Sequence, residues 1–86
     1  MGVEVRYWAA AKAAAGLDAE VVSAFSVGQL VDDVVRRRPG NHEFGRVLSM
    51  SSLLVNGVTT GPVTEGASTP LSPGDVVDVL PPFAGG

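Results

Sequence analysis

The chain has 86 residues and a formal net charge of −3, which suit one domain with one small core and argue against general nucleic-acid binding through phosphate contacts. It has no cysteine, which excludes a disulfide and any side-chain thiol that could act as a nucleophile, a metal ligand or a sulfur carrier. No apolar run approaches the length of a membrane span and no signal-peptide pattern starts the chain, so we expect a cytoplasmic protein without a membrane partner.

The first part of the chain predicts two strands joined by a short helix. Residues 3–7 alternate apolar and polar side chains, which is typical of a strand with one buried face. Residues 9–15 are almost all alanine, the strongest helix former, and Gly16 provides a stop for that helix. Residues 18–25 follow as a second strand that runs up to Phe25.

The best-specified element is a helix that begins after Ser26. Ser26 is an N-cap candidate and Gln29 stands at the capping-box position. Phe25 and Leu30 are spaced as a hydrophobic staple. The apolar residues follow the i, i+3, i+4, i+7, i+8 spacing of a single buried face, which comprises Val27, Leu30, Val31, Val34 and Val35.

Three arginines, Arg36, Arg37 and Arg38, fall in the last turn of this helix, before Pro39 and Gly40. The helix dipole favours cations at that end. Such a cluster could bind an anion, but a run of charge more often marks a solvated face, and we expect a solvated helix end here.

Residues 42–50 predict a second short helix with Phe44, Val47 and Leu48 on one side. His42 is the only histidine, so no second histidine and no cysteine can complete a metal site with it. We expect His42 to be solvated and to take part in no catalytic triad with the nearby serines.

The last part of the chain predicts a hairpin and a final strand. A strand over residues 53–55 turns back at Asn56 and Gly57, which are both able to adopt positive φ and form the strongest short hairpin signal. A loop over residues 61–70 then leads to a buried strand over residues 76–80.

This order of elements predicts an α+β fold, with a mixed sheet and one main helix packed across one face. One helix covers only one face, yet the later strands place apolar side chains on both. Either the short helices cover the second face, or part of it is an exposed apolar patch that docks another protein.

The final strand is stopped by Pro81 and Pro82, because neither can donate to a ladder. Phe83 follows where the strand has already ended. Two outcomes are open for this side chain: with Pro81 and Pro82 it extends the docking patch onto a partner, or it folds back to complete the core. The affinity and stability of a Phe83→Ala variant would separate them.

The chain ends in small residues, Ala84, Gly85 and Gly86. Because the last two lack a Cβ, the end can enter a channel too narrow for side chains. Its only reactive group is the α-carboxylate of Gly86, which needs activation before it can act as an acyl donor. We therefore predict a single domain over residues 1–86, in which residues 81–86 form an exposed tail that another protein activates.

The last sixteen residues resemble the end of a known family. The order is Gly74-Asp75, an apolar strand, Pro81-Pro82, an apolar residue, any residue, and a terminal Gly-Gly. This ending is similar to that of the small subunits of molybdopterin synthase, within the MoaD/ThiS-type sulfur carriers of the β-grasp, ubiquitin-like fold. One departure is Lys12-Ala13, where family members often have Arg-Glu, so any contact made by that glutamate is absent here.

The resemblance implies a carrier chemistry centred on Gly86. An ATP-dependent adenylating enzyme would activate the carboxylate, and a sulfur donor, either a sulfurtransferase or a cysteine desulfurase, would convert it to a thiocarboxylate. Gly85 and Ala84 would enter the channel of the large catalytic subunit, where a pyranopterin precursor of the molybdenum cofactor receives the sulfur. The chain itself would be a non-catalytic carrier subunit that binds no cofactor and no metal, with ATP used by its partner.

Three other readings remain. The same carrier chemistry could serve thiamin or cysteine biosynthesis, although carriers of the thiazole type usually lack the Pro-Pro-aromatic ending. The chain could be a ubiquitin-like modifier conjugated through Gly86, with Lys12 as its only lysine. It could also be an interaction domain with an inert tail.

Overall fold

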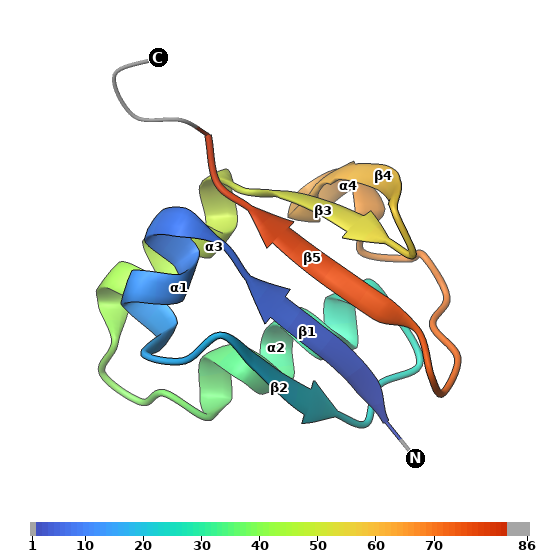
Figure 1. Ribbon diagram of the computed structural model, residues 1–86, viewed down its shortest axis with the longest axis horizontal. Helices are drawn as coiled ribbons and strands as arrows, with labels where there is room; N and C mark the ends of the chain where they lie inside the picture. The colour runs from blue at the N-terminus through green and yellow to red at the C-terminus, as the bar shows by residue number, and fades with distance from the viewer. Residues whose placement is uncertain (1, 83–86) are drawn as a thin grey trace.

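The computed structural model describes residues 2–82 and contains a five-stranded sheet with four helices (Figure 1). Phe83, Ala84, Gly85 and Gly86 lie outside the described residues. In chain order the elements are β1 (Val3–Tyr7), α1 (Ala9–Ala15), β2 (Ala19–Val22), α2 (Val27–Arg36), α3 (His42–Met50), β3 (Ser52–Val55), β4 (Val58–Pro62), α4 (Val63–Gly66) and β5 (Val76–Leu80).

The sheet is mixed, with the strand order β2-β1-β5-β3-β4. The first and last strands, β1 and β5, run parallel and side by side at its centre, and the other neighbouring pairs are antiparallel. Helices α2 and α3 lie behind the sheet in Figure 1. This arrangement confirms the predicted mixed sheet with a main helix across one face. Among residues 2–82, no helix has the length and apolar character needed to cross a membrane.

The core lies between the sheet and the helices. The alternation of β1 buries Val3, Val5 and Tyr7 on the helix side, and the ring of Tyr7 meets that of Phe44 from α3 edge to face, with 5.5 Å between centroids. Leu30 is fully buried in α2, as its predicted apolar face requires. Burying one such aliphatic side chain contributes roughly 1.5–3 kcal/mol to folding.

The second strand ends earlier than predicted, at Val22 and not at Phe25. The cause is that β1 begins at Val3, which already pairs with Val22, so no β1 residue remains for the next positions. The chain instead bridges to the loop before β5 through Ser26 and Pro70. Phe25 is 80% exposed, so the predicted staple with Leu30 is wrong.

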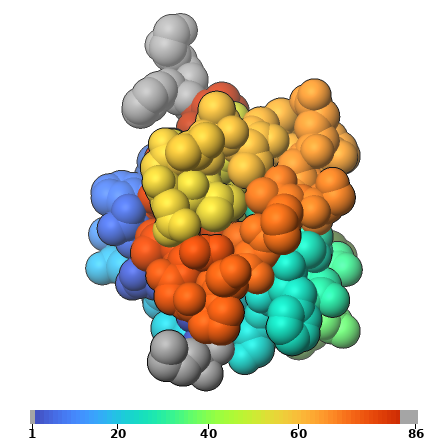
Figure 2. All heavy atoms as spheres, turned by 90° about the vertical axis from the view of Figure 1, so that its right-hand side faces the viewer, coloured from blue at the N-terminus to red at the C-terminus, as the bar shows by residue number. Residues whose placement is uncertain are grey.

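The start of α2 follows the predicted cap with one shift. The Ser26 hydroxyl oxygen accepts from the Gln29 amide at 3.2 Å, and the Gln29 side chain accepts from the Phe25 amide at 2.8 Å, one residue earlier than in a standard capping box. The amides of Val27 and Gly28 donate to the loop after α4, which therefore lies against α2 (Figure 2).

The predicted loop over residues 61–70 is partly ordered. Strand β4 continues to Pro62, and α4 follows at once. The hairpin prediction is confirmed, because Asn56 and Gly57 have φ angles of 50° and 84°. The Asn56 side-chain Nδ2 also donates to Asp75 at 3.0 Å, which ties the hairpin to the turn before β5.

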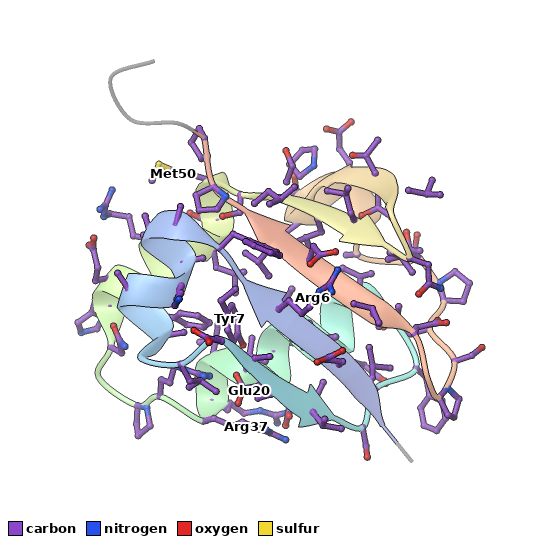
Figure 3. The ribbon with its side chains drawn as sticks, viewed as in Figure 1. Arg6, Tyr7, Glu20, Arg37 and Met50 are labelled. Carbon is purple, nitrogen blue, oxygen red and sulfur yellow. The ribbon has the colours of Figure 1, made fainter. Side chains whose placement is uncertain are left out.

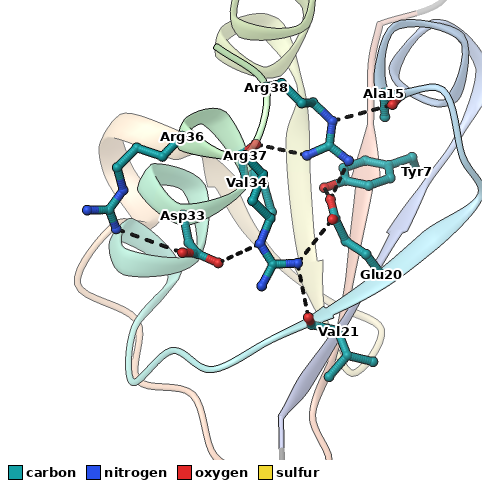
Figure 4. A network of polar contacts seen from close by, with 9 residues as sticks. All are labelled: Tyr7, Ala15, Glu20, Val21, Asp33, Val34, Arg36, Arg37 and Arg38. Carbon is teal, nitrogen blue, oxygen red and sulfur yellow. Dashed lines mark hydrogen bonds and ion pairs between the residues drawn. The ribbon is translucent and has the colours of Figure 1, made fainter.

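The expectation of a solvated end for α2 is wrong for Arg38. Its side chain is only 10% exposed and donates to Glu20 of β2 at 2.6 Å (Figure 4). Its guanidinium carbon lies 4.6 Å from the centre of the Phe44 ring. The Tyr7 hydroxyl donates to the same carboxylate. Arg36, in contrast, is 76% exposed, as predicted.

Candidate functional site

Strand β5 positions the start of the predicted tail. It is hydrogen-bonded on both sides, to β1 and to β3, and the Trp8 amide donates to the Val79 carbonyl near its end at 3.3 Å. Pro81 and Pro82 follow directly; Pro81 is half-buried and Pro82 is exposed. The chain therefore leaves the sheet from a firmly held central strand. The predictions made for Gly86 and the three residues before it fall outside the described residues.

An apolar groove lies at this point. Its lining residues are Trp8, Ala9, Leu80 and Pro81, and its volume is about 290 Å³; we call it the tail-root groove. Trp8 is 47% exposed and Leu80 is 37% exposed. Met50, at the end of α3, is also half exposed at this end of β5 (Figure 3). Large exposed apolar side chains gathered in this way are typical of a protein–protein contact.

The groove continues into the face of the sheet that lies away from α2 and α3, which we call the open face. Register places these side chains of the central strands there, with Ala19 and Val21 of β2 beside them: Glu4 and Arg6 of β1, Val76, Asp78 and Leu80 of β5, and Ser52 and Leu54 of β3. In Figure 1, no helix within residues 2–82 lies over it. The short helices therefore leave the second face uncovered, which favours the docking alternative.

A polar cluster, formed by Arg6, Trp8 and Asp78, lies in the middle of the open face. The Arg6 Nε and Nη2 atoms donate to the two Asp78 oxygens at 2.7 and 2.9 Å, and the Trp8 Nε1 atom donates to Asp78 at 2.8 Å. These contacts cover Asp78, which is only 8% exposed although it lies on the outer face. The hydrogen bond from Arg6, aided by that from Trp8, lowers the pKa of Asp78 against the opposing effect of desolvation.

Glu20 is a second shielded carboxylate, partly buried on the helix side of the sheet. Desolvation is the largest single effect on its pKa and raises it, but the hydrogen bonds from Tyr7, Arg38 and Arg37 together lower the pKa below its usual value. Burial, followed by the bond to Glu20, raises the pKa of the Tyr7 phenol. Sequence reasoning missed this cluster; the one available signal was an acidic residue at an inward position of a short strand.

The remaining polar residues have structural surroundings. Asp75 accepts from the Ser72 amide at 2.8 Å, which lowers its pKa and shapes the turn at Gly74. His42 is exposed at the start of α3, also as predicted. Across the part of the chain that the structure describes, no three potential metal-ligating side chains come together. Residues 2–82 therefore present an uncovered sheet face with an apolar groove at the point where the chain continues to residues 83–86.

A family model described as the ThiS family matches residues 5–86, which is nearly the whole sequence. The chain belongs to the ThiS family. This confirms the resemblance to the MoaD/ThiS-type sulfur carriers, and the match extends through the terminal Gly85-Gly86. No curated protein matches the chain.

Three solved structures, of differently named proteins, are similar in fold to this chain. The complex of subunits 1 and 2 of molybdopterin-converting factor from Helicobacter pylori 26695 matches at a TM-score of 0.70 and 24% identity, over 100% of both chains. Small archaeal modifier protein 1 from Methanosarcina acetivorans matches at 0.78 and 23%, over 98% of this chain and 95% of the other. The BexX/CysO complex from Amycolatopsis orientalis matches at 0.75 and 22%, over 98% and 99%. These likenesses confirm the β-grasp fold.

Proposed function

We propose that this ThiS-family chain is the sulfur-carrying small subunit of molybdopterin synthase. The observation that carries the proposal is the ending Pro81-Pro82-Phe83-Ala84-Gly85-Gly86, placed directly after a central strand and inside the family match. The likeness to a complex of molybdopterin-converting factor subunits supports it.

In the proposed cycle, the Gly86 carboxylate attacks ATP in an adenylating partner, giving an acyl-adenylate and pyrophosphate. A persulfide sulfur of the donor then attacks the acyl carbon and displaces AMP, and a thiol reduces the resulting acyl disulfide to release the thiocarboxylate. Inside the large subunit the thiocarboxylate sulfur attacks a pyranopterin precursor, and water cleaves the resulting thioester to return the Gly86 carboxylate. An unperturbed α-carboxyl group has a reference pKa of about 3.5 and is ionised at neutral pH. Adenylation supplies the leaving group that the free carboxylate lacks.

The open face and the tail-root groove would bind the partner and direct residues 83–86 toward the partner's active site. Four residues follow Pro82, enough to reach about 13 Å when extended. A partner that covers Trp8 and Leu80 would thus receive the tail within its own active site. Small residues at the last positions would let the carboxylate pass through a narrow channel.

Reconstitution tests this proposal. The carrier, loaded with sulfur by its adenylating enzyme and sulfur donor, should form molybdopterin when mixed with the large synthase subunit and the pyranopterin precursor. Trp8→Ala should weaken binding to the large subunit about tenfold or more. Phe25→Ala is the control, because Phe25 is also an exposed aromatic residue but lies at the opposite end of the sheet, beside Gly2 and Pro73.

The other readings give different outcomes. A loaded carrier that yields no molybdopterin but supplies sulfur to thiazole or cysteine synthesis would place the chain in one of those pathways. Isopeptide adducts of Gly86 on other proteins would mark a modifier. A chain whose Gly86 can be deleted without effect would be an interaction domain.

A further inference from the structure

Arg6 stands out on the open face because it is the only basic side chain among the strand residues that point outward there. Its side chain is 46% exposed. Asp78 takes the Nε and Nη2 edge of the guanidinium in a two-point contact. Within residues 2–82, the other edge, formed by Nη1 and the second Nη2 hydrogen, makes no hydrogen bond, and its two N–H groups are parallel.

The surroundings of Arg6 hold this free edge in place. The guanidinium carbon lies 5.9 Å from the centre of the Trp8 ring, and Trp8 donates to the same Asp78 that Arg6 contacts. The neighbours on the open face include Leu54, opposite Asp78 in the sheet, and Val76. Because this pair of donors is already held in place, it has little conformational freedom left to lose on binding.

A partner that covers the open face removes water from these donors. Buried donors left without an acceptor cost free energy, and charged donors cost most. Two parallel N–H groups match the two oxygens of one carboxylate better than they match a single carbonyl. An apolar or basic partner surface at this point would therefore be rejected.

We propose that Arg6 is a specificity-determining residue of the docking surface, and that the partner presents a carboxylate to its free edge, flanked by apolar side chains that meet Trp8 and Leu80. Asp78 is the positioning residue that fixes the guanidinium. The inference rests on the proposed function for the identity of the partner and assigns the chemistry by which that partner is chosen.

The test measures binding of Arg6 variants by calorimetry, with the large subunit of molybdopterin synthase from the same source as probe. Arg6→Lys keeps the positive charge but lacks the pair of parallel N–H donors. It should weaken binding about tenfold to a hundredfold. Arg46→Lys is the matched control, because Arg46 makes a similar two-point contact with Glu43 on α3, away from the open face. It should bind within about twofold of the wild type.

A double variant, Arg6→Leu with Asp78→Leu, separates a loss of binding from a loss of folding. Exchanging an ion pair for apolar side chains usually keeps the fold, and circular dichroism checks it. The folded double variant should also bind at least tenfold more weakly. Arg6→Lys binding as the wild type does, or the double variant binding more tightly, would overturn the inference. If the wild type binds only its adenylating enzyme, the proposed function fails, and the same comparison on that enzyme decides the role of Arg6.

Discussion

Replacing Arg38 with alanine is expected to destabilise the fold by about 2–4 kcal/mol. The change removes a charged hydrogen bond to Glu20 at 2.6 Å, which contributes about 1.5–3 kcal/mol. It also removes the stacking of the guanidinium on Phe44, worth roughly 0.5–2 kcal/mol where both groups are buried. Arg37 and Tyr7 still contact Glu20, so the loss should not reach the upper end of the roughly 3–5 kcal/mol typical of a buried ion pair that loses one partner.

Urea denaturation followed by circular dichroism measures this difference. A domain of this size has an unfolding free energy of about 4–13 kcal/mol, so the expected loss is large and easily resolved. Arg36→Ala is the control, because Arg36 lies two positions earlier on the same helix end and makes only a 3.9 Å contact with Asp33. Its cost should stay below about 0.5 kcal/mol. Equal costs for the two variants would refute the assignment of Arg38 to the core.

The remaining predictions concern pH and a glycine. The pKa values of Glu20 and Asp78 are lowered on folding, so their contribution is present above the unfolded pKa and is lost as pH falls through the folded pKa. The unfolding free energy should be nearly constant from about pH 7 to about pH 5 and should fall below about pH 4; a flat profile down to about pH 3 in urea titrations would contradict this. Gly66→Ala should destabilise the fold by about 1–3 kcal/mol, because the new Cβ would lie 2.8 Å from the Thr60 carbonyl oxygen. Gly45→Ala, which meets open space in α3, should instead stabilise it by about 0.5–1 kcal/mol, and thermal melts of the pair would expose an error if both moved the same way.

Local patterns predicted much of the fold correctly. The alternation in β1, the spacing of apolar residues in α2 and the Asn56-Gly57 turn each depend on residues close in sequence. These predictions hold in the folded protein because the period of a strand or helix alone decides which of its side chains face the core. The Pro81-Pro82 end of β5 was predictable for the same reason.

The misses share a different cause. Arg38 is buried because Glu20, eighteen residues away, provides a partner on the inner side of β2. Strand β2 ends at Val22 because its neighbour β1 begins where it does. Asp78 lies on the outer face of the sheet but is covered by Arg6 and Trp8. Each outcome depends on which distant segments the sheet brings together, and no window of sequence contains that information.

The central claim, that the Gly86 carboxylate carries sulfur, is tested most directly by mass spectrometry. After incubation with the adenylating enzyme, ATP and the sulfur donor, the intact chain should gain about 16 Da, as sulfur replaces one carboxylate oxygen. A variant with one residue added after Gly86 should gain nothing, because its Gly86 carboxyl is held in an amide. An unchanged mass for the wild type under these conditions, or the same gain on the extended variant, would contradict the account.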